Sequence, residues 1–259
     1  MPPSVARTPG SAWRAGPIDA FTDSDGTTLR MMPEGTTLTV RRGRLARGEG
    51  YAAATPANRQ FLARMGAIVR LRALGRFHLH AAAVADAAGR VWILTGENGA
   101  GKSTLAYALV RQGWKLIGDD GVIIERTANG ITAYPWREPL AVSRALVSAF
   151  PELAEKANEP GYRDERDRVP MRFPVTKRGT VAALAILQRG DSDTLERMSQ
   201  AEVLAFLVKQ SVMVMLADGH SAAHLAALQA LAMSVPAYRL THTRRALLEI
   251  AATLGGALQ

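Results

Sequence analysis

An eight-residue stretch with the pattern G-x-x-x-x-G-K-[ST] constrains this chain more than any other feature. It runs from Gly96 to Ser103 within LTGENGAGKSTL, between the apolar run RVWILTG and a segment of helical composition. Closely spaced glycines let backbone amides face phosphate oxygens, and a helix that begins at the loop adds partial positive charge. The stretch and its flanks therefore predict a phosphate-binding loop between a strand and a helix.

The positions of this loop have distinct expected roles. Lys102 would neutralise the β and γ oxygens of a nucleoside triphosphate such as ATP, and Ser103 would give an oxygen ligand to Mg²⁺. Thr104 supplies a second hydroxyl next to it. The residues expected to contact the phosphates are Gly96, Asn98, Gly99, Ala100, Gly101, Lys102, Ser103 and Thr104.

Two adjacent carboxylates follow the next expected strand. Asp119 and Asp120 stand in LIGDDG, just far enough after Lys102 for one helix and one strand. One carboxylate of such a pair can hold Mg²⁺ while the other accepts a proton from an attacking hydroxyl. The alternative interpretation is a surface turn in which the two side chains only cap a chain reversal.

Histidines lie in two places where chemistry is conceivable. A single histidine in an apolar strand is commonly a buried core residue, but strand alternation puts His78 and His80 on one face, and a hairpin would bring that strand beside the loop. His220 and His224 share one helix face. Without an HExxH pattern or a cysteine, we do not expect a metal site there.

Hydrophobic periodicity assigns the rest of the chain to strands and helices. Residues 1–17, rich in Pro, Gly, Ala and Ser, predict a disordered tail, residues 18–56 a small β-rich segment, and residues 57–259 the domain that carries the loop. We expect helices over 58–74, 103–112, 143–150, 199–210, 221–233 and 243–254, and strands over 77–86, 90–96, 114–118, 180–190 and 237–241. Asn129 and Gly130 predict a further hairpin, so the sheet should be mixed.

Composition narrows the classes of function. The absence of cysteine excludes disulfides, thiolate zinc sites and a cysteine nucleophile. The net charge of +9 favours anionic partners, although a solvated arginine-rich surface would give the same charge. No stretch of basic and aromatic residues favours nucleic acid, and no LSGGQ-like signature favours an ABC-type ATPase. No export signal or 18-residue apolar run is present, so we expect no membrane association and a cytoplasmic location.

Three segments together resemble one known family. LHAAAV, GENGAGKST and QGWKLIGDDGVII, from about Leu79 to Ile124, are similar in order and spacing to the kinase domain of the HPr kinase/phosphorylase family, which is related in fold to ATP-dependent phosphoenolpyruvate carboxykinases. Weaker likeness extends to YPWREPL, MSQAEVLAFL and VPAYRL. The resemblance implies an α/β fold with a P-loop mixed β-sheet and flanking helices.

The resemblance also implies a reaction, the transfer of the γ-phosphoryl group of ATP to a serine hydroxyl with Mg²⁺ as cofactor. It makes Asp119 the general base, supported by His80, and gives Asp120 and Ser103 to the metal. A charged segment over residues 163–178 holds six basic and three acidic residues and predicts a functional loop. Its Arg172, Lys177 and Arg178 would close over the γ-phosphate or grip the substrate, and closure excludes water.

The acceptor is suggested by the length of the chain. The segment before the kinase block is short compared with full-length HPr enzymes, and the chain looks more like the shorter stand-alone relatives. Some of these accompany lasso peptide gene clusters and phosphorylate the precursor peptide, so the expected partner is a peptide or small protein with an acceptor serine. The alternatives are an HPr-type carrier protein serine kinase and a non-catalytic ATP-sensing regulator. A homo-oligomer stays open.

Overall fold

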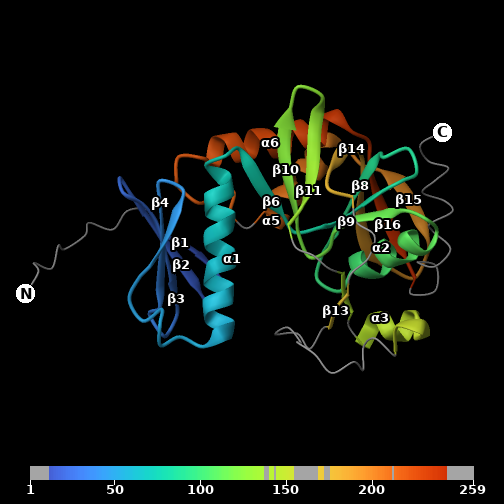
Figure 1. The fold of residues 1–259 in the computed structure, drawn as a ribbon. Coiled ribbons are helices and arrows are strands. Elements are labelled where there is room, and N and C mark those ends of the chain that lie inside the picture. Colours follow the sequence, from blue (N-terminus) through green and yellow to red (C-terminus); the bar gives the residue numbers. More distant parts are fainter. Residues whose placement is uncertain are drawn as a thin grey trace, which may run out of the picture. The chain divides into compact units, whose positions relative to one another are not determined.

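The computed structural model describes residues 12–136, 140–142, 144–154, 169–171, 176–211 and 213–243. The chain divides into two compact units, residues 1–77 with 212–226 and residues 78–211 with 227–259. Each unit has its own sheet (Figure 1). The loop predicted to bind phosphate belongs to the second unit.

The first unit is built on an antiparallel meander whose strands pair in chain order. These strands are β1 (Ala12–Ala15), β2 (Ile18–Asp23), β3 (Gly26–Met31), β4 (Thr37–Arg41) and β5 (Arg44–Arg47). Strand β1 lies within the segment that we assigned to a disordered tail, and it pairs with β2 over its whole length. An ion pair of 2.6 Å between Arg14 Nε and Asp19 Oδ1 joins the same two strands.

Helix α1 (Pro56–Arg72) packs against β3, β4 and β5, and it confirms the helix predicted over residues 58–74. Thr55 caps its first turn by accepting a hydrogen bond from the amide of Asn58. Gly66 permits a close approach to the sheet, because a Cβ atom there would lie 2.7 Å from Cδ2 of Leu38. This packing places α1 with the first unit, whereas we predicted a boundary between residues 56 and 57.

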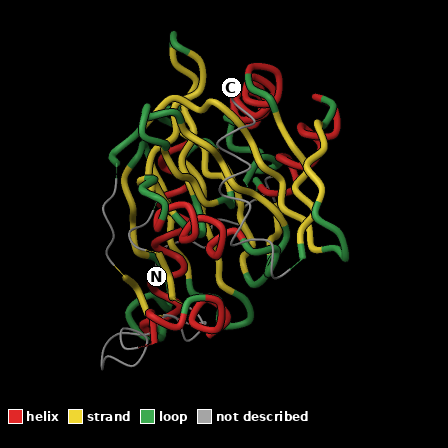
Figure 2. Tube along the Cα trace, turned by 90° about the vertical axis from the view of Figure 1, so that its right-hand side faces the viewer, coloured by secondary structure: helices red, strands yellow, loops and turns green. Residues whose placement is uncertain are grey.

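The second unit is built on a mixed sheet, as predicted. Its main path runs β6–β10–β11–β14–β8–β7–β9, and β16 pairs with both β14 and β15. The strands are β6 (Arg76–Leu79), β7 (Ala82–Ala85), β8 (Val91–Gly96), β9 (Lys115–Gly118), β10 (Val122–Thr127), β11 (Gly130–Pro135), β14 (Gly179–Arg189), β15 (Thr194–Arg197) and β16 (Ala237–His242). Strand β14 is parallel to β8 and β16, whereas β7 is antiparallel to β8 and β9. Figure 2 shows the curl of this sheet, with helices beside it.

The remaining helices follow the first strands of this sheet. They are α2 (Lys102–Arg111), α3 (Arg144–Ala149), a 3₁₀ turn (Pro151–Leu153), α5 (Gln200–Gln210) and α6 (Ser221–Ser234), and a separate ladder joins β12 (Leu140–Val142) to β13 (Val169–Met171). Helix α6 begins in the first unit and ends in the second. Buried Trp92 and Leu94 of β8 pack with Leu105 and Leu109 of α2 in one cluster. The loop is thus anchored by an apolar strand on one side and an apolar helix face on the other.

Most of the predicted elements are confirmed, with two differences in detail. The strand predicted over residues 77–86 is broken at His80 and Ala81, so β7 pairs with β8 while β6 belongs to the other end of the sheet path. The predicted hairpin forms, but Thr127 pairs with Gly130, which moves the turn one residue earlier to Ala128 and Asn129. The helix predicted over residues 243–254 lies outside the described residues, apart from Thr243. Among the residues described, no helix is both long and apolar enough to cross a membrane.

Candidate functional site

The loop between β8 and α2 is shaped by glycines in conformations that other residues rarely adopt. Gly99 has φ +79° and Gly101, the N-cap of α2, has φ +97°. Gly96 passes so close to β14 that a Cβ atom would lie 2.6 Å from the carbonyl oxygen of Leu187. The predicted phosphate loop therefore has the strand, the turn and the helix start that its pattern requires.

Lys102 is held within the loop itself. Its side chain is buried, and its Nζ donates to the carbonyl oxygens of Gly96 at 2.8 Å and Glu97 at 3.1 Å. A cation fixed at the start of a helix adds to the positive potential of the helix N-terminus. The loop thus combines backbone amides with one buried charge that attracts an anion.

Asp119 joins the loop to the end of the neighbouring strand. Strand β9 ends at Gly118, and the next residue, Asp119, is 2% exposed. Ser103 Oγ donates a hydrogen bond of 2.8 Å to Asp119 Oδ1. The expectation that a carboxylate after this strand reaches the loop is met, and the surface-turn alternative does not fit a buried aspartate.

Asp120, the second carboxylate, lies beside His80. Its φ of +62° is in the left-handed region, which aspartate tolerates better than most residues. His80 Nδ1 lies 3.8 Å from Asp120 Oδ1 and 3.4 Å from the backbone oxygen of the same residue. The amide of His80 donates to Gln210 O, and its carbonyl oxygen accepts from Thr95 Oγ1. The break between β6 and β7 is thereby fixed at the position that presents this imidazole.

His78 lies against the same turn as His80, next to Gly121. Its ring packs edge-on against Trp136, with 5.5 Å between the ring centroids, beneath the turn that carries the two aspartates. Gly121 also contacts this pair, because a Cβ atom there would lie 2.7 Å from Trp136 Cδ1. His78 therefore lies against Gly121 while His80 lies against Asp120, so both histidines face the same turn, as strand alternation predicted.

His242, a residue that the sequence did not single out, also contacts the loop. It is buried at the end of β16, and its Nε2 lies 2.7 Å from the carbonyl oxygen of Ala100. A carbonyl oxygen can only accept, so Nε2 carries the proton in this hydrogen bond. The pattern AYRLTH indicates a strand, but nothing in it reveals a partner 142 residues away.

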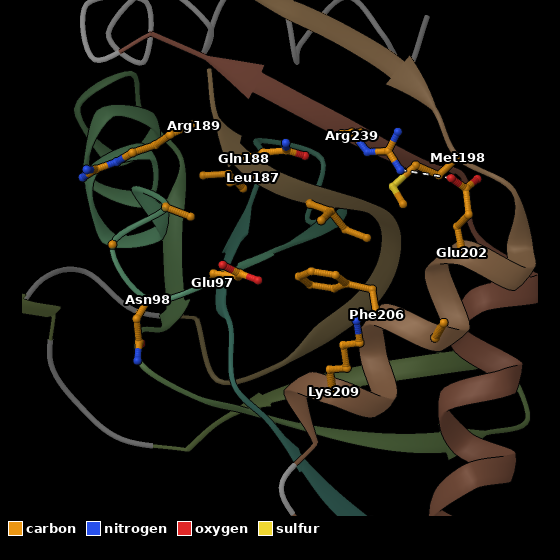
Figure 3. A pocket seen from close by; sticks show the side chains of 14 residues that line it. Glu97, Asn98, Leu187, Gln188, Arg189, Met198, Glu202, Phe206, Lys209 and Arg239 are labelled. Atoms are coloured by element: carbon orange, nitrogen blue, oxygen red, sulfur yellow. Dashed lines mark hydrogen bonds and ion pairs between the residues drawn. The ribbon is translucent and has the colours of Figure 1, made fainter. Parts of the chain in front are cut away.

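A pocket of about 700 Å³ opens beside the loop. Figure 3 shows its walls, which are loop residues 97–100, residues 186–189 at the end of β14, one face of α5, and Arg239 of β16. One face of α5 lines the pocket with residues at helical spacing, Glu202, Ala205, Phe206 and Lys209. The sequence therefore predicts that these residues share a helix face, but it does not predict that the face lines a pocket. The guanidinium of Arg189 lies 4.0 Å from the place of a Cβ atom on Gly99.

Two of the three basic residues of the expected lid, Lys177 and Arg178, are described by the structure. Arg172 is outside the described residues, and Lys177 and Arg178 are exposed just before β14. Because β14 and β8 are parallel, the start of β14 lies against Val91, the first residue of β8, whereas the loop follows the last. The structure therefore places these two side chains at the sheet end opposite to the phosphate loop.

The oxygen donors at the loop fit Mg²⁺ better than they fit a soft metal. Within the described ranges, no group of three or more His, Cys, Asp and Glu side chains could hold a metal ion. Mg²⁺ needs no such cage, because it binds through one or two carboxylates together with substrate phosphates and water. The hydroxyl of Ser103 and the carboxylate of Asp119 are such donors.

Comparisons with known proteins find similarity among solved structures. No family model matches the chain, and the search of curated proteins gives no match. Among solved structures, the chain is similar to the Hpr(Ser) kinase/phosphatase from Coxiella burnetii. The two share 13% identity and a TM-score of 0.36 over 70% of this chain and 95% of that one. At this TM-score we base no assignment on the similarity, and the α/β fold with a mixed sheet follows from the strands and helices themselves.

Proposed function

We propose that this protein is an ATP- and Mg²⁺-dependent kinase that transfers the γ-phosphoryl group to a serine hydroxyl of a peptide or protein. The observation that carries the proposal is the hydrogen bond of 2.8 Å from Ser103 to Asp119, which links a phosphate loop to a pair of carboxylates. Phosphoryl transfer needs little more from a protein than positioning and charge stabilisation, together with a group that accepts the proton of the acceptor hydroxyl.

The loop performs the positioning. Its amides face the phosphate oxygens, and Lys102 gives the β and γ oxygens a fixed positive charge that needs no reorganisation during transfer. The buried ammonium already occupies the centre of the loop through its contacts with Gly96 and Glu97. In-line transfer then requires that the acceptor hydroxyl approach from the side of the carboxylates.

Geometry favours Asp119 as the carboxylate on the metal side, although the resemblance gives the metal to Asp120. Ser103 is hydrogen-bonded to Asp119. In P-loop nucleoside triphosphatases, Mg²⁺ is usually held by a loop serine or threonine together with an aspartate at the end of a neighbouring strand. When bound, Mg²⁺ neutralises charge that develops on the transferring phosphoryl group.

Asp120 is then the better placed general base. Its carboxylate lies 3.8 Å from His80 Nδ1, and both side chains are about one fifth exposed, so an acceptor hydroxyl can reach them. An imidazole beside the carboxylate can orient it and share the proton that it receives. The proton of the serine hydroxyl would pass to Asp120 as the new O–P bond forms and ADP leaves.

The two carboxylates can be told apart by their variants. We expect Asp119→Asn to raise the Mg²⁺ concentration needed for half-maximal transfer at least tenfold, because an amide oxygen lacks the charge of the carboxylate. Asp120→Asn should keep the Mg²⁺ requirement and the ATP affinity but lower kcat about 10² to 10⁴-fold. Initial rates over a Mg²⁺ titration measure both values, and full transfer by Asp120→Asn would exclude this residue as the base.

The acceptor we propose is a precursor peptide of the lasso type. The net charge of +9 would attract a flexible acidic peptide. Incubation of the full chain with ATP, Mg²⁺ and serine peptides should add the mass of one phosphate to a serine peptide and not to its Ser→Ala counterpart. An HPr-type carrier protein belongs in the same panel. Tight ATP binding without a phosphorylated product would instead identify an ATP-sensing regulator.

A further inference from the structure

We propose that the pocket beside the loop holds the base and ribose of the nucleoside triphosphate, with Phe206 as the surface on which the base stacks. This inference rests on the proposed function, because it assigns the other half of the same substrate. It is carried by the order of the strands around the loop, the walls of the pocket, and the position of Phe206.

The strand order separates the carboxylates from the pocket. Strand β8, which leads into the loop, lies between β14 and β7, and β9 lies beyond β7. Asp119 and Asp120 follow β9, whereas the pocket uses the end of β14. A triphosphate that lies on the loop with its γ-phosphate at the carboxylates therefore extends its nucleoside toward β14. Crevices outside the carboxyl ends of strands are where α/β proteins commonly bind such ligands.

The walls of the pocket are continuous with the phosphate site. Residues 97–100 form part of the loop and part of the pocket lining at the same time. The volume of about 700 Å³ lies within the usual range for small-molecule sites, roughly 300–1,000 Å³. Ile186, Leu187 and Met198 supply apolar surface, and Gln188 adds an amide at the same strand end. The lining also holds polar and charged side chains, among them the carboxylates of Glu97 and Glu202. A mixed lining of this kind, with carboxylates among its polar groups, suits the apolar face of a base and the hydroxyls of a ribose better than it suits further phosphates.

Phe206 is held at the centre of this lining by the helix that carries it. Val203 and Leu207 anchor α5 in the core, which leaves the neighbouring Phe206 half-buried at the pocket. Figure 3 shows its ring pointing into the pocket, with the carboxylate of Glu97 facing it from the loop. A fixed aromatic ring can stack on any nucleotide base, because every base has a π-face.

The rim of the pocket is also fixed. Arg239 Nη2 donates a hydrogen bond of 3.0 Å to Glu202 Oε1, which ties β16 to the first turn of α5. This contact holds the aromatic face in place relative to the end of β14. A contact that is present before a ligand binds lowers the ordering cost of binding.

The test compares two ligands that share the phosphates and differ in the nucleoside. Binding of ATP and of inorganic tripolyphosphate to the full chain is measured by calorimetry in the presence of Mg²⁺. Phe206→Ala should raise the Kd for ATP about tenfold or more and leave the Kd for tripolyphosphate unchanged. Phe206→Trp should keep the ATP affinity. Leu204→Ala, at a partly buried position of the same helix outside the pocket, is the matched control and should change neither value.

The outcomes separate this inference from the proposed function. Lys102→Ala should weaken the binding of both ATP and tripolyphosphate. If it weakens the binding of neither, the phosphate site and the proposed kinase both fail. If Lys102→Ala weakens both while Phe206→Ala leaves ATP unchanged, the phosphate site stands and the base lies elsewhere. If Phe206→Ala reduces the affinities for ATP and for tripolyphosphate equally, the ring supports the loop and does not contact the base. Phe206→Leu, which keeps the apolar packing, repeats the comparison if Phe206→Ala does not fold.

Discussion

At the scale of single residues, neighbours in the sequence can have separate chemistry. Asp119 is buried and bonded to Ser103, whereas Asp120 is partly exposed and lies beside His80. The left-handed backbone of Asp120 turns the chain between them. The sequence predicted that both carboxylates belong to the site, but their different surroundings accompany a positive φ angle at Asp120 that no motif encodes.

His242 provides a test of the loop at this scale. Its hydrogen bond to the carbonyl oxygen of Ala100 holds the middle of the loop, so His242→Ala should free that carbonyl group and weaken ATP binding about fivefold, or about 1 kcal/mol. Calorimetric titration with ATP measures the change. His220→Ala, in the other unit, is the control, and equal affinities for the two variants would contradict a role for His242 in the loop.

Sequence reasoning found the residues whose roles are local and missed those whose roles depend on distant partners. Lys102 and Ser103 belong to a motif whose strand, loop and helix are contiguous, so their positions follow from the pattern. His242 and Phe206 reach the site only because β16 and α5 pack beside the loop. Hydrophobic patterns predict which face of an element is buried, but they do not name what that face meets.

At the scale of secondary structure elements, α5 depends on a capping box at its start. The hydroxyl of Ser199 accepts from the amide of Glu202 at 3.3 Å, and Glu202 Oε2 accepts from the amide of Ser199 at 3.1 Å. The sequence SQAE contains this signature, which is why the helix start was predictable within one residue. The broken strand at His80 had no such signal, because residues 77–86 contain no glycine or proline that would mark a break.

The cap makes the stability of α5 sensitive to acid. Hydrogen bonds from Ser199, then Arg239, lower the pKa of Glu202 from 4.5 to about 2. Because the folded state has the lower pKa, this contribution is complete above about pH 4.5 and is lost as the pH falls toward 2. Ser199→Ala should lower the free energy of unfolding by about 1 kcal/mol near neutral pH. On acidification the variant should lose less of its free energy of unfolding than the wild type loses.

Thermal unfolding followed by circular dichroism at several pH values measures this difference. Thr55→Ala removes the cap of α1, whose first turn holds no acidic residue, and serves as the matched control. Its acid sensitivity should equal that of the wild type. If Ser199→Ala also loses as much stability as the wild type when the pH is lowered, the carboxylate of Glu202 does not stabilise the cap.

At the scale of the whole molecule, the first unit is discontinuous in sequence and closes through one arginine. Arg72, at the end of α1, pairs with Asp218 through two contacts of 2.7 Å, and its side chain is fully buried. It also donates to the carbonyl groups of Met213 and Leu216 and lies 2.6 Å from His224 Nδ1. Burial raises the pKa of Asp218, but the hydrogen bonds and charge of Arg72 outweigh this and lower it. Sequence periodicity could not predict a pairing of residues so far apart.

Arg72→Met should therefore destabilise the protein strongly. It leaves Asp218 buried without its ion-pair partner, which typically costs about 3–5 kcal/mol. Urea unfolding measures the change in the free energy of unfolding. Arg90→Met removes a more exposed pair with Asp86, at 2.7 Å, and should cost about 1 kcal/mol or less. Similar costs for the two variants would contradict a closing role for Arg72.

The central claim, that this site transfers a phosphoryl group to a hydroxyl and not to water, is tested most directly by a product balance. The full chain is incubated with γ-labelled ATP, Mg²⁺ and a serine peptide, and ADP, phosphopeptide and free phosphate are quantified together. We predict one phosphopeptide for each ADP, and loss of both products in Lys102→Ala. ADP matched by free phosphate alone, at the same rate with and without peptide, would contradict the account.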